Sequence, residues 1–337
     1  MDSIRVGIVG AGYWGPNLIR NFSDLPQSRV LGVADLKEDR LKHIKANFPQ
    51  VSVTQDYKDL LDMGLDAMVI ATPPASHYKL AKECLEKGMH VLVEKPLTLY
   101  SNQAIELIEL AEKKHRTLMV GHTFEYNPAV RALKSLIDSG ELGQIYYLDA
   151  ARLNLGLFQN GVNVLWDLAP HDISIIYYLL DQDPVSVNAS GMPCVFQGLY
   201  DVVYINLVFP NNVLAHIHVS WLEPCKVRRL TVVGSSTMVV YNDIEPMEKI
   251  KIYDKGVEAP SYTTTFGEFQ CAYRYGDIRI PNIKFTEPLR LECQDFLECI
   301  SNSHKPVSSG EDGLRVIRVL EAAQRSLDNQ GRVEYLA

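Results

Sequence analysis

Short apolar runs alternate with segments of helical spacing through the first 121 residues. The runs are IRVGIV, RVLGVAD, DAMVIAT, HVLVEK and TLMVGH, and SNQAIELIELAEKKH is one of the helical segments between them. Continuously apolar runs are typical of strands that helices cover on both faces of a sheet. The pattern predicts a doubly wound α/β domain with a parallel sheet over residues 1–121, and ligands bind such sheets at the carboxyl ends of the strands.

The pattern changes after Gly121. NPAVRALKSLIDSGELG has helical spacing, whereas DVVYINLVFP, NVLAHIHVSWLEP and RRLTVVGSSTMVVYND are strand-like runs separated by turn residues. We expect a second, α+β domain over residues 122–337 with a large, mostly antiparallel sheet. Residues 254–288 contain many aromatic residues and prolines without a clear period, so we expect a long and functional loop there.

Composition excludes several classes of protein. A chain of 337 residues with 47% hydrophobic residues is large enough for two cores, and its net charge of −8 repels nucleic acid. We expect a cytoplasmic protein without a membrane partner, since the N-terminus lacks a signal-peptide pattern and no apolar run reaches about 18 residues. The six cysteines have no C-x-x-C spacing, so neither a disulfide framework nor a bound metal is expected.

A glycine motif follows the first predicted strand. Gly10, Gly12 and Gly15 stand in G-x-G-x-x-G register before a helix, where a tight turn allows a pyrophosphate to approach the helix N-terminus. Asp35 ends the next strand 20 residues after Gly15, where a carboxylate binds ribose hydroxyls and repels an added 2′-phosphate. Leu36 follows it in place of an arginine, so NAD is favoured over NADP. The expected cofactor contacts in this region are Gly10, Gly12, Tyr13, Trp14, Gly15 and Asp35.

The stretch VEKPLT ends a predicted strand on a charged pair. Pro96 disfavours helical backbone at Lys95, which places this cation in extended chain at the ligand end of the sheet. There its ammonium can donate a hydrogen bond to a substrate hydroxyl or to a developing carbonyl. Glu94 can steady Lys95 or contact the cofactor. The alternative is a solvated charge pair at a strand end.

A second polar motif is WDLAPHD. Asp167 and His171 are four residues apart, so on a helix both side chains point to the same ligand. Imidazole is suited to removing a hydroxyl proton near neutral pH, and a carboxylate can hold its tautomer or bind a substrate hydroxyl. The alternative is an N-cap aspartate with a partly buried histidine.

Three stretches together carry a family resemblance: VGIVGAGYWG, ATPPASHYKLAKECLEKGMHVLVEKPLT and WDLAPHDISII. A chain with these motifs resembles the glucose-fructose oxidoreductase, inositol dehydrogenase and rhizopine catabolism (Gfo/Idh/MocA) family over nearly its whole length. The resemblance implies a Rossmann domain in which Lys95 lies beside the nicotinamide and the reacting carbon. It also implies that Asp167 and His171 are the acid/base pair, with His171 as general base. Some relatives use tyrosine at the histidine position, which leaves the direction of proton transfer open.

Further site residues are expected with less support from pattern. Thr72, Pro73 and His77 resemble the family's loop beneath the nicotinamide ribose, and Glu94 and Lys95 complete the cofactor contacts. His77 is equally consistent with a surface position at a helix start. The expected substrate contacts, besides Asp167 and His171, are Tyr126, Asn127 and Arg152. The alternative is that these three are ordinary polar residues of the surface or pack in the core.

Two classes of function fit these motifs. The first is an NAD-dependent dehydrogenase that acts on a sugar ring hydroxyl, and the second is a non-catalytic protein that senses NAD. Lys95 and His171 favour the enzyme because a sensor needs neither. The chain looks most like C3 dehydrogenases of UDP-N-acetylhexosamines, such as UDP-N-acetylglucosamine (UDP-GlcNAc), in cell-surface polysaccharide or lipid A pathways. This likeness is carried by the stretches GYWGPNLIRNF and GHTFEYNPAVRALKSLIDSGELGQI. An NADP-dependent 3-ketosugar reductase and an inositol or hexose dehydrogenase are the alternatives.

Two expectations concern larger surfaces. A nucleotide sugar needs cations for its diphosphate, and Arg274, Arg279 and Lys284 are candidates within the predicted loop. His216, His218 and Trp221 fit poorly on a solvated strand face, which predicts a homodimer, or a homotetramer as the resemblance suggests, formed through the second domain's sheet. No third ligand accompanies the two histidines, so a metal is not expected there.

Overall fold

The computed structural model describes residues 3–156, 158, 162–258 and 271–336. The chain forms two compact units. The first comprises residues 1–126 and 286–318, and the second comprises residues 127–285 and 319–337. The predicted boundary at residue 121 lies close to the observed one, but residues 286–318 belong to the first unit although they were expected in the second domain.

The first unit contains a six-stranded sheet in the order β3-β2-β1-β4-β5-β6, and neighbouring strands in it are parallel. Its strands are β1 (Ile4–Val9), β2 (Ser28–Ala34), β3 (Ser52–Thr54), β4 (Ala67–Ile70), β5 (His90–Glu94) and β6 (Leu118–Gly121). The five predicted runs are all strands, and the three-residue β3 at the edge is the strand that the pattern missed. The strand order reverses between β1 and β4, the usual crevice for a ligand in such a sheet.

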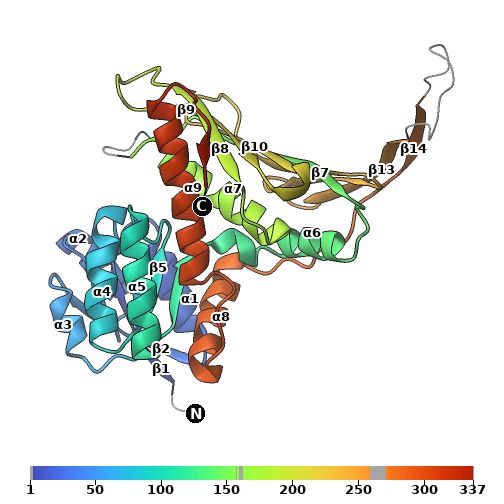
Figure 1. The fold of residues 1–337 in the computed structure, drawn as a ribbon. Helices are drawn as coiled ribbons and strands as arrows, with labels where there is room; N and C mark the ends of the chain where they lie inside the picture. Colours follow the sequence, from blue (N-terminus) through green and yellow to red (C-terminus); the bar gives the residue numbers. More distant parts are fainter. Residues whose placement is uncertain (1–2, 157, 159–161, 259–270, 337) are drawn as a thin grey trace. The chain divides into compact units, whose positions relative to one another are not determined.

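Helices connect these strands and cover the sheet (Figure 1). They are α1 (Gly15–Asp24), α2 (Glu38–Asn47), α3 (Lys58–Leu61), α4 (His77–Glu86) and α5 (Ser101–Lys114), with the 3-10 turns η1 (Pro74–Ser76) and η2 (Thr123–Tyr126). Because crossovers between parallel strands are right-handed, α1 and α2 lie on one face and α4 and α5 lie on the other.

One helix from the far end of the chain completes the core of this unit. α8 (Pro288–Asn302) packs beside α1, and the two share a cluster of buried apolar side chains with β1 and β2. The rings of Phe22 on α1 and Phe296 on α8 meet edge to face, with centroids 6.3 Å apart. This packing explains why residues 286–318 belong to the first unit. α9 (Gly310–Asp328) follows and spans the boundary between the two units.

The second unit is a nine-stranded sheet in the order β14-β13-β12-β11-β7-β10-β9-β8-β15. The β7–β10 pair is parallel and the other neighbouring strands are antiparallel, which confirms a mostly antiparallel sheet. The strands are β7 (Ile145–Leu153), β8 (Ser186–Met192), β9 (Val202–Val208), β10 (Leu214–Ser220), β11 (Val227–Gly234), β12 (Met238–Asn242), β13 (Ile250–Glu258), β14 (Ala272–Arg279) and β15 (Glu334–Tyr335).

Two helices and a short turn accompany this sheet: α6 (Pro128–Asp138), α7 (Val164–Leu180) and η3 (Pro210–Asn212). α7 packs on β7, β9 and β10, and most of its side chains are buried. The long loop predicted over residues 254–288 is wrong in part, because β13 reaches Glu258 and pairs with β14. Residues 259–270 lie outside the described residues. Across the described parts of both units, no helix combines the length and apolar character needed to cross a bilayer.

Replacing Phe296 by alanine tests the contribution of α8 to the first unit. The ring is fully buried against Phe22, so its removal leaves a cavity and should lower the free energy of unfolding by about 3–5 kcal/mol. Phe285→Ala is the matched control because that ring is 67% exposed. Chemical denaturation measures both, and equal small effects would contradict the packing role of α8.

Candidate active site

The glycine turn between β1 and α1 is built around close backbone approaches. Gly10 has φ +101°, and a Cβ there would lie 2.4 Å from the carbonyl oxygen of Ala71. A Cβ on Gly15 would lie 2.2 Å from the carbonyl oxygen of Gly10. At Gly12, by contrast, the nearest atom to a Cβ is Nη1 of Arg40 at 3.5 Å. The turn therefore requires glycine twice for its own geometry and leaves its outer side accessible to a ligand.

Asp35 is buried at the end of β2 and is tied to this turn. Its Oδ2 accepts a hydrogen bond from the Ala11 amide at 2.7 Å, and its Oδ1 accepts one from the Lys37 amide at 2.8 Å. Burial opposes ionisation, but these two donors and the Arg40 guanidinium outweigh it and lower the pKa of Asp35. The side chain is thus an anchored carboxylate, and its Oδ1, with one donor, keeps a lone pair for a ribose hydroxyl.

Arg40 on α2 is a residue that sequence reasoning missed. Its Nη1 lies 3.2 Å from Oδ2 of Asp35, beside the open side of Gly12. The arginine stands five residues after Asp35 rather than directly after it, so only the first turn of α2 brings it back to the glycine turn. Tyr13 and Trp14 in the same turn are both exposed, and their rings meet edge to face at 5.7 Å.

Glu94 and Lys95 lie where β5 ends, on the same edge of the sheet. Glu94 is 9% exposed, and a Cβ on its neighbour Gly121 in β6 would lie 3.1 Å from its Oε2. The glycine therefore makes room for the carboxyl group. Burial raises the pKa of Glu94 to about 7, against the opposing effects of the Lys95 charge and the Lys95 amide. Lys95 itself is half-buried and joined to Pro96 by a cis peptide bond.

Two buried residues beside this pair did not stand out in the sequence. His122 directly follows β6, and burial together with the charge of Lys95 lowers its pKa to about 3, so its ring is neutral. Glu292 on α8 is buried, and its Oε2 accepts a hydrogen bond from the Thr123 hydroxyl at 2.7 Å. Glu292 lies far from VEKPLT in the chain and carries no motif, so only the packing of α8 places it here.

His77 links two loops at this edge. Its ring nitrogens lie 2.8 Å from the carbonyl oxygen of Pro96 and 2.7 Å from that of Thr72. The ring is fully buried, and burial lowers its pKa. The alternative of a surface position is therefore wrong. His77 holds the loops after β4 and β5 together, while Thr72 is half-buried and Pro73 is exposed.

In the second unit, α7 carries Asp167 and His171 one turn apart, as the spacing predicted. Asn163 caps the helix by accepting from the Trp166 amide at 3.2 Å, so Asp167 is in the first turn but is not the cap. Oδ2 of Asp167 accepts a hydrogen bond from the indole of Trp221 at 3.1 Å. Asp167 and His171 are both half-buried, which leaves part of each side chain accessible.

Trp221 is fixed by close packing. The indole is buried, and a Cβ on Gly156 would lie 2.5 Å from its Cδ1. The Trp221 indole therefore provides a rigid donor for Asp167. The prediction that Trp221 shares the dimer-forming sheet face with His216 and His218 is wrong, because the residue lies just beyond β10 and is buried within its own unit.

Three predicted substrate contacts have structural partners instead. Arg152 and Asp172 form a buried bidentate ion pair, with bonds of 2.7 and 3.0 Å. Tyr126 is fully buried and donates to Asp295 at 2.7 Å. Asn127 caps α6 and donates to the Tyr241 hydroxyl at 3.0 Å. Each polar group is thus occupied inside its own unit, which favours a structural role over substrate contact.

Two of the three cations proposed for a diphosphate have acidic partners, and the third, Lys284, is exposed. Arg274 pairs with Asp254 at 2.8 Å across the β13–β14 hairpin, and Arg279 pairs with Glu141. Ion pairs of exposed residues contribute little to stability, but they occupy these guanidinium groups.

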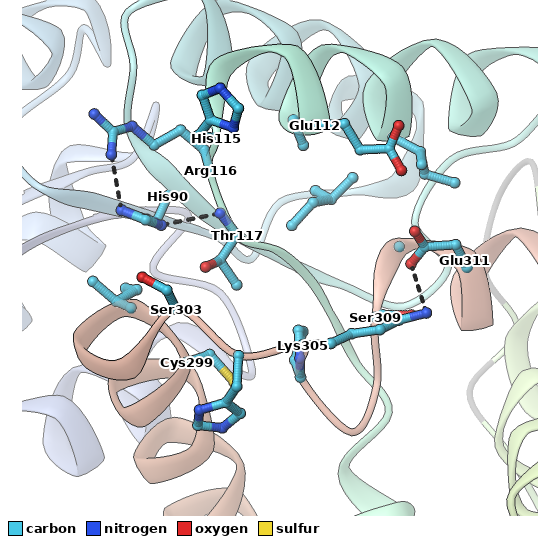
Figure 2. Close-up of a pocket in the computed structure, with 17 residues that line it drawn as sticks. His90, Glu112, His115, Arg116, Thr117, Cys299, Ser303, Lys305, Ser309 and Glu311 are labelled. Carbon is cyan, nitrogen blue, oxygen red and sulfur yellow. Dashed lines mark hydrogen bonds and ion pairs between the residues drawn. The ribbon is translucent and has the colours of Figure 1, made fainter.

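A cavity of about 540 Å³ in the first unit lies at the opposite edge of the sheet (Figure 2). It is lined by the first residues of β5 and β6, the end of α5 and the segment that joins α8 to α9, with His90, Arg116 and Cys299 among its residues. Because ligands of doubly wound sheets bind at the carboxyl ends of strands, this cavity is separate from the residues described above.

Comparison with known proteins agrees with this geometry. The model of the oxidoreductase family with an NAD-binding Rossmann fold matches residues 4–122, and that of the GFO/IDH/MocA C-terminal domain matches residues 130–240. The chain belongs to the GFO/IDH/MocA family. It is an oxidoreductase of the family whose Rossmann fold binds NAD, as the family model shows.

Similarity extends over the whole length of individual relatives. The UDP-N-acetylglucosamine 3-dehydrogenase of Acidithiobacillus ferrooxidans is 27% identical, with 96% of each chain aligned. The myo-inositol 2-dehydrogenase of Thermotoga maritima is 23% identical, with 98% of each chain aligned. The crystal structure of a gentamicin A biosynthesis protein in complex with NAD has a TM-score of 0.84 at 21% identity, covering 100% of this chain and 97% of the other.

The residues of the glycine turn fit NAD. The open side of Gly12 and the N-terminus of α1 suit a pyrophosphate, and Oδ1 of Asp35 suits an unmodified ribose hydroxyl.

Replacing Asp35 by serine and Leu36 by arginine should shift the preference from NAD towards NADP. The double variant removes the carboxylate that repels a 2′-phosphate and adds a cation beside Arg40, so the ratio of the two dissociation constants should change about tenfold or more. Titration of both cofactors measures this ratio, with Leu36→Ala as the control. An unchanged ratio in the double variant would contradict the role of Asp35.

Proposed function

We propose that the protein oxidises the C3 hydroxyl of a UDP-N-acetylhexosamine, with UDP-N-acetylglucosamine as the first candidate, in cell-surface polysaccharide or lipid A biosynthesis. The support is the relative of that activity, aligned over 96% of both chains, together with the half-sites on β5 and α7. Inositol dehydrogenases align with similar identity, so a polyol such as myo-inositol is the second candidate.

The observation that carries the proposal is the arrangement of the acid/base pair, Asp167 and His171, on α7. Trp221 holds the Asp167 carboxylate at 3.1 Å, and His171 follows one turn later. A fixed carboxylate can hold the imidazole in the tautomer that accepts a proton, and imidazole is an effective base near neutral pH. A protein that only senses NAD has no use for such a pair.

In this mechanism the two units contribute different parts. Lys95 donates a hydrogen bond to the substrate oxygen and stabilises the negative charge that develops there. His171 takes the hydroxyl proton, and Asp167 orients the imidazole. Bound NAD supplies a hydride acceptor at its nicotinamide. Asp35 and the glycine turn would hold the cofactor at the carboxyl ends of the parallel strands.

A substrate panel tests the proposal directly. UDP-N-acetylglucosamine, UDP-N-acetylgalactosamine, dTDP-glucose, glucose and myo-inositol are each incubated with NAD, and NADH formation is recorded. We expect the highest kcat/KM with a UDP-N-acetylhexosamine. A higher value with myo-inositol would replace the proposed substrate, and no turnover on the panel would contradict it.

Two single variants test the assigned roles. His171→Ala and Lys95→Ala should each lower kcat about 10²–10⁴-fold, because one removes the base and the other removes the stabilising cation. NAD affinity should stay nearly constant in both. His216→Ala is the control, since that histidine lies on β10 and hydrogen-bonds Asn206. Near-wild-type turnover in either variant would show that its residue was wrongly assigned.

We also propose that two copies of the chain form a homodimer through one face of the second unit's sheet. Tyr147, Leu214 and Val208 lie next to one another in register across β7, β10 and β9, and all three are exposed. Along β10 the alternate residues are buried, so the exposed row lies on the face opposite the one that α7 covers. His216 and His218 share this face and stack on Tyr204. A row of exposed apolar side chains on a sheet favours a protein partner.

Leu214→Asp should convert the dimer to a monomer, because it places a charge in the centre of the apolar row. Light scattering at micromolar concentration measures the mass. Met247→Asp is the control because Met247 is exposed outside these strands. A monomeric wild-type protein would contradict the proposal.

A further inference from the structure

Three side chains with metal-binding atoms lie together at the end of α8. They are Asp295, Cys299 and His304, and one possible ligand atom from each lies within 4.8 Å of those of the other two. All three belong to the first unit, and Cys299 and His304 also line the cavity at the first residues of β5 and β6 (Figure 2). The three side chains are therefore separate from the residues proposed to bind NAD and substrate.

The backbone brings these three residues together. Asp295 and Cys299 are four positions apart on α8, so they share one face of the helix. The helix ends just before Ser303, whose left-handed backbone, with φ +54°, turns the chain back. The turn is held in place because the Val307 amide donates to Oδ2 of Asp295 at 3.1 Å. His304 lies within this turn, and its Nε2 is 3.9 Å from Oδ1 of Asp295.

Asp295 is oriented by hydrogen bonds on the side away from His304. Its Oδ2 accepts from the Tyr126 hydroxyl at 2.7 Å as well as from the Val307 amide, whereas Oδ1 is the oxygen nearest to the imidazole. Carboxylates that bind metals are commonly held by such hydrogen bonds, which fix the direction of the binding oxygen. The Cys299 thiol is buried and hydrogen-bonds Asp295 from the same helix face.

The donor set favours zinc. Zinc is bound in proteins by thiolate sulfur, imidazole nitrogen and carboxylate oxygen, whereas magnesium and calcium prefer oxygen ligands alone. With bonds of about 2.0–2.3 Å, the ligand atoms of a tetrahedral zinc site lie about 3.3–3.8 Å apart. The observed limit of 4.8 Å therefore requires a contraction of about 1 Å, which the exposed His304 ring can supply by rotating.

Charge also permits a divalent cation here. Burial and Asp295 raise the pKa of the Cys299 thiol to about 12, so zinc has to displace the thiol proton, as it does at cysteine ligands generally. The resulting thiolate and Asp295 together match the charge of the ion. Beside the site, Lys305 pairs with Glu311 at 3.4 Å. His90, which lines the same cavity, is neutral because burial lowers its pKa to about 4.

We propose that Asp295, Cys299 and His304 bind one zinc ion, with water from the cavity as the fourth ligand. The ion joins the end of α8 to the turn before α9, and so stabilises the helix that carries Phe296 into the core of the first unit. Cysteines without C-x-x-C spacing argue against a cysteine-rich zinc site, but not against one with a single cysteine. The inference does not depend on the proposed function, because neither NAD nor a sugar takes part in it.

Titration with cobalt tests the ligands. The full-length protein is freed of metal with a chelator, and Co²⁺, a spectroscopic substitute for zinc, is added. We expect a sulfur-to-cobalt charge-transfer band that saturates at one ion per chain and disappears when Zn²⁺ is added. Cys299→Ser should lose this band. His304→Ala should weaken zinc binding about 100-fold or more, since even groups that only orient a metal ligand are worth about 10–100-fold.

Two variants are matched controls, Cys225→Ser and His115→Asn. Cys225 is an exposed cysteine of the second unit, and His115 lines the same cavity with a left-handed backbone that asparagine tolerates. Both should bind cobalt and zinc like the wild type. A wild-type protein without the band, or a band that survives in Cys299→Ser, would overturn the proposal. Unchanged zinc affinity in His304→Ala would also overturn it, and this exposed position leaves the fold intact even if Cys299→Ser does not fold.

Thermal unfolding tests the effect on the first unit. At about 100 times its dissociation constant, Zn²⁺ should raise the melting temperature of the metal-free wild type by about 5 °C or more, because only the folded chain holds the three ligands together. Mg²⁺ at the same concentration should have no effect. The shift should persist in Cys225→Ser and disappear in His304→Ala. Equal shifts in these two variants would show that zinc binds elsewhere and would refute the assignment.

Discussion

Parallel pairing of β1, β4, β5 and β6 is the constraint on which the first unit's chemistry depends. Since parallel strands end at the same edge, segments that are far apart in the sequence come together there: the glycine turn, the loop after Ile70, the Glu94–Lys95 pair and His122. Buried apolar residues of the strands stabilise the fold, whereas the residues proposed to contact ligands lie at or just beyond the strand ends.

Charge at this edge is controlled by burial as much as by partners. Asp35 is held ionised by two backbone donors and Arg40, whereas Glu94 and Glu292 are pushed towards protonation by burial. The same functional group, a carboxyl, therefore has opposite behaviour within one unit. An anionic carboxylate is needed where ribose hydroxyls are bound, and a proton-retaining one is tolerated where Lys95 already supplies charge.

Much of this arrangement could be predicted from sequence because its signals are local. The glycine spacing, Asp35 and the i, i+4 pair on α7 each lie within one element or one turn. Arg40, His122, Glu292 and Trp221 could not be predicted, since each acquires its role from tertiary packing. Arg152 was misleading for the same reason: an arginine on a strand has the same local pattern whether it faces a ligand or, as here, Asp172. The β13–β14 hairpin was missed because its irregular composition hides the alternation of a strand.

The packing of α8 against α1 also bears on the order in which the chain can fold during synthesis. Phe296 and its neighbours on α8 fill the core under the sheet of the first unit, but they emerge from the ribosome only after β14, when eight of the nine strands of the other sheet have been made. Domains commonly fold from the N-terminus onward, but this one keeps an uncovered apolar surface until a late helix is synthesised.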